Sequence, residues 1–275
     1  MQCVLSDEAL LQYFRDDVPY GDLTTELLLN PDQPLTIQFS ARQSMTLCCV
    51  EEAARLFQLK NSATEMRSFS GAKLSTGDIF LTAKGAAADL FAVWKVAQTM
   101  IEWASGVATS TSSLVDVAQG VPVVCTRKQN PGTKALSVKA VKAGGGGIHR
   151  LGLSESILVF AEHRQFNDLE PKTLLQHLKR RAPEQLAVVE VHSVQDAIEW
   201  IKAGVAVLQM DKFTIEQVQQ LSAYCFDINS QTLLAAAGGL NQHNVEAYVK
   251  AGARLIVTSS PYHAQPQDVQ VRFMN

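Results

Sequence analysis

The chain lacks any long run of apolar residues, although 47% of its 275 residues are hydrophobic. No stretch approaches the roughly 20 apolar residues that a helix needs to span a bilayer. The opening residues, MQCVLSDEALLQYFRDD, contain acids and have no basic head before an apolar core, so we expect no signal peptide. These absences predict a cytoplasmic protein without membrane insertion.

An excess of positive charge and paired cysteines are also missing. The chain carries 24 Lys and Arg against 27 Asp and Glu, a formal net charge of −3, which argues against nucleic acid as a general partner. Its five cysteines form no CxxC pair, and their odd number and wide spacing do not suggest a disulfide framework. Any basic cluster is therefore a local site on a mildly acidic surface.

One such cluster lies in residues 121–153, VPVVCTRKQNPGTKALSVKAVKAGGGGIHRLGL, which contain six Lys and Arg and no carboxylate. The β-branched run 121–126 predicts a buried strand, and Arg127 and Lys128 follow where that strand ends. After a Pro-Gly turn, residues 134–143 predict a helix with one buried side. The two cations are thus expected at the carboxyl end of a strand.

Four glycines at 144–147 follow this helix and lead to His149 and Arg150. Glycine permits positive φ and close approach of the backbone, so the loop can present N–H groups to an anion beside two cations. This pattern predicts a site for a polyphosphate or polycarboxylate. In the alternative interpretation the glycines are a flexible connector, and Lys139 and Lys142 belong to a solvated helix face.

The first third of the chain differs in pattern from the rest. Residues 35–84 read as strands with a single helix, which predicts a separate α+β domain. A helical tract from Ala86 to about Ala118 follows, with a break expected near Ser105-Gly106. We place an N-terminal α/β sandwich domain at residues 1–104, with the C-terminal tail 263–275 packing on it.

Strands and helices alternate beyond this tract. About six strands predict a parallel barrel at residues 105–262, open or incomplete because eight strands are usual. The expected strands are Val121–Thr126, Ser156–Phe160, Leu186–Val191, Val205–Met210, Thr232–Ala237 and Arg254–Thr258.

Polar or small residues stand at the carboxyl ends of these strands, where a barrel binds its ligands. They are Arg127-Lys128, Glu162-His163, Glu190, Asp211, Gly238-Gly239 and Ser259-Ser260. Cations, carboxylates and two small-residue turns are therefore expected to meet at one mouth.

Two of these residues, Glu190 and Asp211, end apolar strands, where a carboxylate is costly unless it is paired. Hard oxygen ligands of this kind suit Mg²⁺ that also contacts substrate phosphates. Salt bridges to Lys128 or Arg150 are the alternative.

The turns at Gly238-Gly239 and Ser259 lie where barrels often bind a phosphate through backbone amides. The mouth then has a place for a terminal phosphate, a cationic place for a second anion and carboxylates between them. Phosphoribosyl pyrophosphate has these three parts. Transfer from its anomeric carbon passes through an oxocarbenium-like state, which cations on the departing pyrophosphate and nearby carboxylates assist.

The motifs TRKxxPG and GGGxxHRxGL, with GDLTT near the start, resemble the signature of the nicotinate-nucleotide pyrophosphorylase (carboxylating), or quinolinate phosphoribosyltransferase, family. The resemblance covers nearly the whole chain. It implies the same donor, Mg²⁺, and a type II phosphoribosyltransferase fold with an N-terminal sandwich and an open barrel. It also implies a homodimer in which the N-terminal domain of one subunit covers the barrel of the other. The residues that carry over are Arg127, Lys128, His149, Arg150, Glu190, Asp211, Gly238 and Gly239.

The chain departs from that family at the expected acceptor pocket. Trp103 in IEWASG replaces an arginine, and Phe160 in ILVFAEH replaces a lysine, while His163 aligns with the family's KDNH histidine. Each charge-assisted hydrogen bond is worth roughly 1.5–3 kcal/mol, so losing both cations weakens a pyridine dicarboxylate by about two to four powers of ten. The pattern is similar to the molybdenum-transport-associated ModD branch of the family.

Three functional hypotheses follow. The first is a phosphoribosyltransferase for a flat, less anionic heteroaromatic acceptor. The second is carboxylating quinolinate chemistry of NAD biosynthesis, and the third is a non-catalytic oxyanion or nucleotide binder linked to molybdate transport. In the first hypothesis, the pyrophosphate is bound by Arg127, Lys128, His149 and Arg150, and the metal and the ribose are bound by Glu190 and Asp211. The 5′-phosphate is bound by Gly238, Gly239 and Ser259, and the acceptor is bound by Trp103 and Phe160. The catalytic candidates are Lys128, Glu190 and Asp211.

Overall fold

The computed structural model describes residues 2–275, which divide into two compact units. The first unit contains the chain up to Ser112 together with Gln129–Gly145 and Pro261–Asn275. The second contains Ser113–Lys128 and Gly146–Ser260. The predicted barrel range of 105–262 includes residues 105–112, 129–145 and 261–262, which contacts assign to the first unit.

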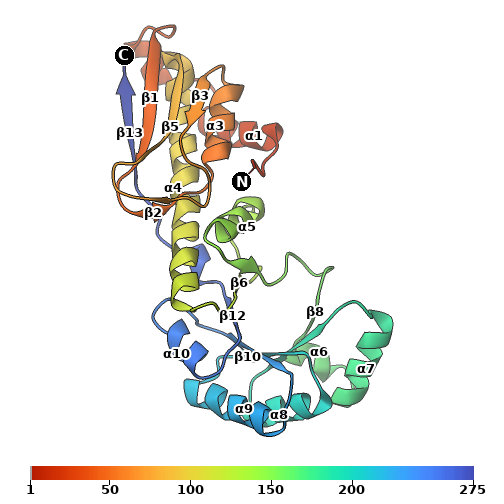
Figure 1. Ribbon diagram of the computed structural model, residues 1–275. Helices are drawn as coiled ribbons and strands as arrows, with labels where there is room; N and C mark the ends of the chain where they lie inside the picture. The colour runs from red at the N-terminus through yellow and green to blue at the C-terminus, as the bar shows by residue number, and fades with distance from the viewer. Residues whose placement is uncertain (1) are drawn as a thin grey trace. The chain divides into compact units, whose positions relative to one another are not determined.

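In the described part of the chain, the first unit contains a four-stranded antiparallel sheet in the order β13-β1-β5-β3 and a small β2-β4 pair. The last strand, β13, pairs with β1 along its whole length, so the end of the chain completes this sheet (Figure 1). The strands are β1 (Pro34–Ala41), β2 (Met45–Thr46), β3 (Ala63–Met66), β4 (Lys73–Leu74), β5 (Ile79–Ala86) and β13 (Val269–Met274), and the helices are α1 (Asp7–Asp17), α2 (Leu23–Leu28), α3 (Val50–Leu59) and α5 (Lys134–Ala143).

The long helix α4 (Ala87–Val117) continues without interruption through Ser105 and Gly106, so the predicted break is wrong. Both residues serve packing instead. The Ser105 hydroxyl accepts a hydrogen bond from the Cys48 amide at 2.9 Å, and a Cβ at Gly106 would collide with the carbonyl oxygen of Gln265. Across residues 2–275 no helix, this one included, combines the length and apolarity required to cross a bilayer.

Helix α5 is held in the first unit by a buried ion cluster. The Lys139 ammonium, with its side chain 1% exposed, lies 2.9 Å from Glu51 Oε2 and 2.6 Å from Glu52 Oε2. It also donates to the Gln2 carbonyl at 3.1 Å. Lys139 therefore belongs neither to a solvated helix face nor to an anion site, whereas Lys142 on the same helix is exposed.

Within residues 2–275 the second unit contains a seven-stranded parallel sheet in the order β7-β6-β12-β11-β10-β9-β8, an open α/β barrel as predicted. The seventh strand, β7, comes from the end of the glycine loop, where Gly147 and Ile148 pair with β6. The strands of this sheet are β6 (Val123–Cys125), β7 (Gly147–Ile148), β8 (Ile157–Val159), β9 (Ala187–Val191), β10 (Val207–Asp211), β11 (Leu233–Ala237) and β12 (Leu255–Thr258), and the helices of the unit are α6 (Ala161–Gln165), α7 (Pro171–Arg181), α8 (Val194–Ala203), α9 (Ile215–Asp227) and α10 (Val245–Lys250). The 3₁₀ helix η1 (Ser260–His263) begins at the last residue of this unit, and its other residues belong to the first unit.

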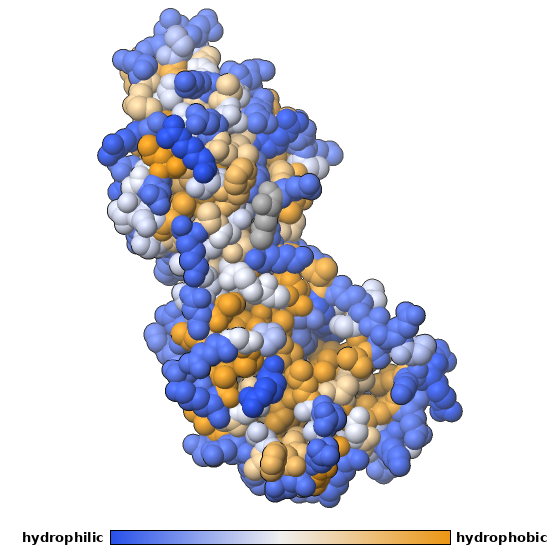
Figure 2. Space-filling view, in the orientation of Figure 1, coloured by the Kyte–Doolittle hydropathy of each residue, from blue (hydrophilic) through white to orange (hydrophobic). Residues whose placement is uncertain are grey.

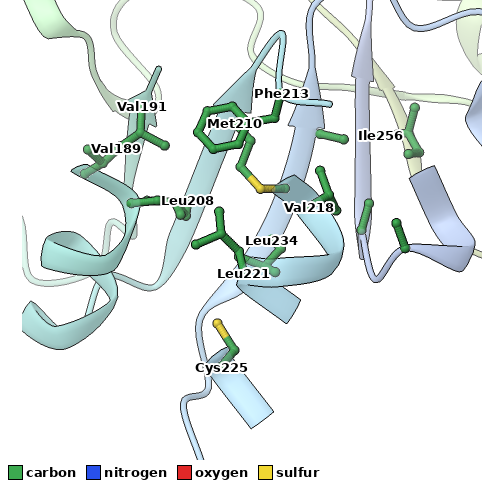
Figure 3. Close-up of a cluster of buried hydrophobic side chains, with 14 of the residues drawn as sticks. Val189, Val191, Leu208, Met210, Phe213, Val218, Leu221, Cys225, Leu234 and Ile256 are labelled. Carbon is green, nitrogen blue, oxygen red and sulfur yellow. The ribbon is translucent and has the colours of Figure 1, made fainter. Parts of the chain in front are cut away.

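The main core of this unit lies between the sheet and the helices that cover its outer face (Figure 1). Leu208 and Met210 of β10 point to this side, where they meet Val218 and Leu221 of α9 (Figure 3). Burying such side chains stabilises the fold by about 1.5–3 kcal/mol each. Because side chains alternate along a strand, the residues between them face the other side of the sheet.

The inner face of the sheet carries smaller side chains. Ala235, Ala237 and Val257 form a separate buried cluster there. In the space-filling view, apolar side chains gather on the visible face of this unit and hydrophilic side chains surround them (Figure 2). Small inward residues leave room above them, at the carboxyl ends of the strands, for a ligand cavity.

Candidate active site

A cavity of about 660 Å³ opens at the carboxyl ends of the parallel strands, within the second unit. Ten of the eleven site residues predicted from the sequence line it. These are Arg127, Lys128, His149, Arg150, Phe160, Glu190, Asp211, Gly238, Gly239 and Ser259. The expected meeting of cations, carboxylates and small-residue turns at one mouth is present.

Arginines form one wall of the cavity. Arg127 follows β6 and is exposed, whereas Arg150, which follows β7, is only 8% exposed. Burial and the neighbouring Arg127 lower the pKa of Arg150 below its usual value, while Glu155 and Glu190 act in the opposite direction. Arginine remains protonated despite such shifts. Two adjacent cations, one of them desolvated, therefore favour binding of an anion.

His149 differs from its arginine neighbour. Burial, followed by the positive charge of Arg150, lowers the pKa of His149 below its usual value of 6.5. The imidazole is therefore largely neutral at pH 7. The sequence suggested two cations at His149 and Arg150, but His149 offers a hydrogen bond rather than a charge.

Glu190 and Asp211 lie on the adjacent strands β9 and β10, and the partners that contact them are not Lys128 or Arg150, which were the alternative to metal binding. Gln209 donates to Glu190 Oε2 at 2.6 Å. The His192 ring lies 3.6 Å from Glu190 Oε1 and 3.8 Å from Asp211 Oδ2. Burial raises the pKa of Glu190, as does the charge of Asp211, although the Gln209 hydrogen bond acts against both.

This carboxylate pair fits a divalent cation shared with a substrate. The raised pKa of Glu190 means that its charge lacks full compensation from the protein. Among residues 2–275 no three His, Cys, Asp or Glu side chains are arranged to hold a metal by themselves. Mg²⁺ commonly takes one or two carboxylates and completes its shell with water and substrate phosphates. The donor set therefore suits Mg²⁺ brought in with a phosphorylated substrate.

The Gly238-Gly239 turn follows β11 and has positive φ at both residues, +85° and +77°. A Cβ on Gly238 would lie 2.6 Å from Asp211 Oδ1 and 2.8 Å from the Lys212 amide nitrogen. Gly239 has nothing within 4 Å of the same position. Only Gly238 is therefore required for close packing beneath Asp211.

Alanine at these two glycines is expected to have unequal effects. A positive φ costs a non-glycine residue about 1–2 kcal/mol, which Gly239→Ala should lose in unfolding free energy. Gly238→Ala should lose more, because it also overlaps the backbone and displaces the Asp211 carboxylate. Denaturant unfolding of both variants measures this difference. Equal losses would contradict the packing role of Gly238.

Phe160 connects the cavity to a second pocket of about 590 Å³ in the same unit. The Arg150 guanidinium lies 5.5 Å from the centre of its ring, and the His163 ring stacks on it at 5.6 Å. His163 Nδ1 accepts from the Phe160 amide at 3.0 Å and lines the second pocket only. These contacts fix Phe160 as an aromatic wall beside a cation.

Trp103 is the predicted site residue that the barrel cavity does not include. It belongs to α4 in the first unit. There it lines an apolar pocket of about 540 Å³ with Tyr13, Met100 and Leu136.

Gln209, Lys212 and His192 are among the residues of the site that sequence reasoning missed. Gln209 and Lys212 line the cavity, and His192 contacts both carboxylates. Lys212 and His192 directly follow β10 and β9, so the rule that selected Glu190 and Asp211 would have found them. Gln209 lies inside a strand and carried no such signal.

Comparisons with known proteins identify the family. The model of the quinolinate phosphoribosyl transferase C-terminal domain matches residues 107–272, and that of the N-terminal domain matches residues 22–105. "Putative pyrophosphorylase ModD" of Rhodobacter capsulatus is 41% identical over 256 residues, covering 91% of this chain and 98% of that protein. The protein of the same name from Pasteurella multocida is 36% identical over 272 residues, covering 97% and 96%.

Solved structures show the same fold. A nicotinate-nucleotide pyrophosphorylase from Francisella tularensis superimposes with a TM-score of 0.89 over 97% of this chain and 95% of that one, at 20% identity. At this identity the match shows the fold alone. The two family matches, which together span most of the chain, and the close relatives show that the protein is an enzyme of the quinolinate phosphoribosyl transferase family.

Proposed function

We propose that the protein transfers a phosphoribosyl group from phosphoribosyl pyrophosphate to a heteroaromatic acceptor. The observation that carries this proposal is that one cavity is lined by two arginines and by a carboxylate pair, with a glycine turn alongside. An inorganic oxyanion would need only part of this set. A sugar with phosphates at both ends uses all of it.

The proposed donor spans the cavity. Its pyrophosphate contacts Arg127, Lys128 and Arg150, with His149 giving a neutral hydrogen bond. The ribose lies against Glu190 and Asp211, which also hold Mg²⁺. The 5′-phosphate binds the backbone amides of the Gly238-Gly239 turn and Ser259. Mg²⁺, when bound, supplies positive charge that stabilises the departing pyrophosphate.

In the proposed reaction a ring nitrogen of the acceptor attacks the anomeric carbon. The bond from that carbon to the pyrophosphate oxygen breaks, and its electron pair leaves with the pyrophosphate. Lys128 and the arginines stabilise the negative charge on the leaving group, while Glu190 and Asp211 stabilise the positive charge that develops on the sugar ring.

Phe160 would form the acceptor side of the site. Its ring offers an apolar face to a flat heterocycle, with Arg150 beside it to bind one anionic group. Trp103 belongs to the acceptor pocket in this proposal only through a homodimer, in which the first unit of one copy covers the barrel of the other. Light scattering in solution would test this: a monomeric mass would remove Trp103 from the site.

Pyrophosphate release tests the proposed activity. Wild-type protein with phosphoribosyl pyrophosphate, Mg²⁺ and a panel of heteroaromatic acids is expected to release pyrophosphate in an acceptor-dependent manner. Glu190→Gln should abolish most of this release. Arg254→Met, at the opposite end of β12, is the control and should leave it unchanged. No release with any acceptor in the panel would contradict the proposal.

Quinolinate is the second candidate acceptor, favoured by the matches to both domain models of its family. Formation of nicotinate mononucleotide and carbon dioxide from quinolinate distinguishes it. We expect turnover with quinolinate to be about two to four powers of ten below that with the best acceptor, because Trp103 and Phe160 replace cations. Comparable turnover would make quinolinate the substrate.

A further inference from the structure

Gln209 lies in the floor of the cavity and has no role in the proposed transfer. It is 5% exposed. On β10 it stands in register with Glu190 of β9 and Ala235 of β11. Its strand neighbours Leu208 and Met210 pack on the opposite face (Figure 3), so alternation directs Gln209 into the barrel interior, one layer below Asp211.

The contact with Glu190 fixes which way the amide points. Nε2 donates to the Glu190 carboxylate at 2.6 Å. Turning the amide over would place its carbonyl oxygen against that carboxylate, which is repulsive. The oxygen, Oε1, is therefore held on the other side of the group.

On that side Oε1 is buried and has no hydrogen-bond partner among the described residues. The in-register neighbour on β11, Ala235, is buried and offers only a methyl group. Buried polar atoms in native proteins are nearly always satisfied, and an exception calls for an explanation. In a ligand cavity, the simplest explanation is a donor that the ligand supplies.

We propose that Gln209 is a substrate-binding residue, whose Oε1 accepts a hydrogen bond from a neutral O–H or N–H group of the bound substrate. This inference rests on the proposed function and names a polar group that the site recognises. The donor is a hydroxyl of the ribose or an N–H of the acceptor. An anionic group is excluded at this position, because it would face both Oε1 and the Glu190 carboxylate.

Access requires a small movement of the amide. Gln209 lines the cavity, so a small rotation about its last side-chain torsion, with the hydrogen bond to Glu190 retained, turns Oε1 toward a ligand. For glutamine this torsion has a broad minimum, and the rotation is therefore inexpensive.

Ligand truncation combined with Gln209→Met tests the inference. Calorimetry would measure binding of phosphoribosyl pyrophosphate and of its 2-deoxy and 3-deoxy analogues. A second arm would compare pyridine carboxylates with and without an amino group as acceptors in pyrophosphate release. Leu208→Met, one residue away on the opposite face, is the control, and thermal unfolding checks that both variants fold.

For one of these ligand pairs, wild type and Leu208→Met are expected to prefer the donor-bearing member by about 5- to 150-fold, the cost of an unsatisfied buried group. Gln209→Met should bind both members within about twofold, the limit of additivity. The ligand pair whose discrimination is lost in Gln209→Met shows whether the ribose or the acceptor supplies the hydrogen-bond donor. If Gln209→Met kept the discrimination of wild type, another residue would accept this hydrogen bond, and the inference would fail while the proposed function stood. Failure of wild type to bind phosphoribosyl pyrophosphate would overturn the proposed function as well.

Discussion

Replacing Arg127 and Arg150 together with methionine is expected to weaken phosphoribosyl pyrophosphate binding by about two to four powers of ten. Each arginine is expected to make a charge-assisted hydrogen bond worth about 1.5–3 kcal/mol, and 1.4 kcal/mol corresponds to one power of ten. Arg150 should account for the larger share, because it is buried and its interactions are less screened. Isothermal titration calorimetry with Mg²⁺ present measures the loss.

Arg254→Met is the matched control for this experiment. Arg254 is an exposed arginine of the same unit that immediately precedes β12 and donates to the backbone carbonyls of Val249 and Ala253. It removes one positive charge at the opposite end of the strands, so it is compared with the double variant per charge removed. If the double variant and this control lost the same affinity for each charge removed, the effect would be one of net charge, and the arginine wall would have no specific role.

Lys139→Met is expected to cost about 3–5 kcal/mol of unfolding free energy, the usual result of removing one partner from a buried ion pair. The two carboxylates of Glu51 and Glu52 would then be left in a site that is 7% and 0% exposed. Lys142→Met, an exposed lysine on the same helix, should change stability by less than about 0.5 kcal/mol. Adding Glu52→Gln to Lys139→Met should recover part of the loss, because it removes an unpaired charge.

The pH dependence of this loss follows from the shifted groups. Burial alone would raise the pKa of Glu51, but hydrogen bonds from Ser70 and Lys139 bring it below its usual 4.5. That stabilisation is present above pH 4.5 and is lost as the pH falls through the lower pKa that Glu51 has in the folded protein. Burial alone would lower the pKa of Lys139, but Glu52 and Glu51 raise it above 10.5, so its stabilisation persists up to that pH. The difference in unfolding free energy between wild type and Lys139→Met should therefore be constant between these two pH limits and should decrease in acid. A difference that stays the same at every pH would contradict the ion cluster.

The barrel and its mouth could be predicted because local patterns determine them. Each of the six expected strands is a short apolar run, and the polar residue that ends it marks the carboxyl edge of the sheet. Arg127, Glu190, Asp211 and Gly238 were identified in this way, with no long-range information. The seventh strand, β7, was not predicted because Gly147 and Ile148 have no strand-like pattern. They form a strand because they pair with β6.

Features that depend on distant residues could not be predicted. Lys139 reads as a solvated helix lysine, and only Glu51 and Glu52, nearly 90 residues earlier, give it a buried partner. Ser105-Gly106 read as a helix break, yet Gln265 and Cys48 pack against them. Gln209 looks like an ordinary strand residue until the register of β9 and β10 sets it against Glu190.

A crystal structure of the protein with phosphoribosyl pyrophosphate and Mg²⁺ tests the central claim most directly. We expect the pyrophosphate against Arg127 and Arg150, the ribose against Glu190 and Asp211, and the 5′-phosphate at the Gly238-Gly239 turn. Donor bound elsewhere, or bound with its phosphates away from these residues, would contradict the account.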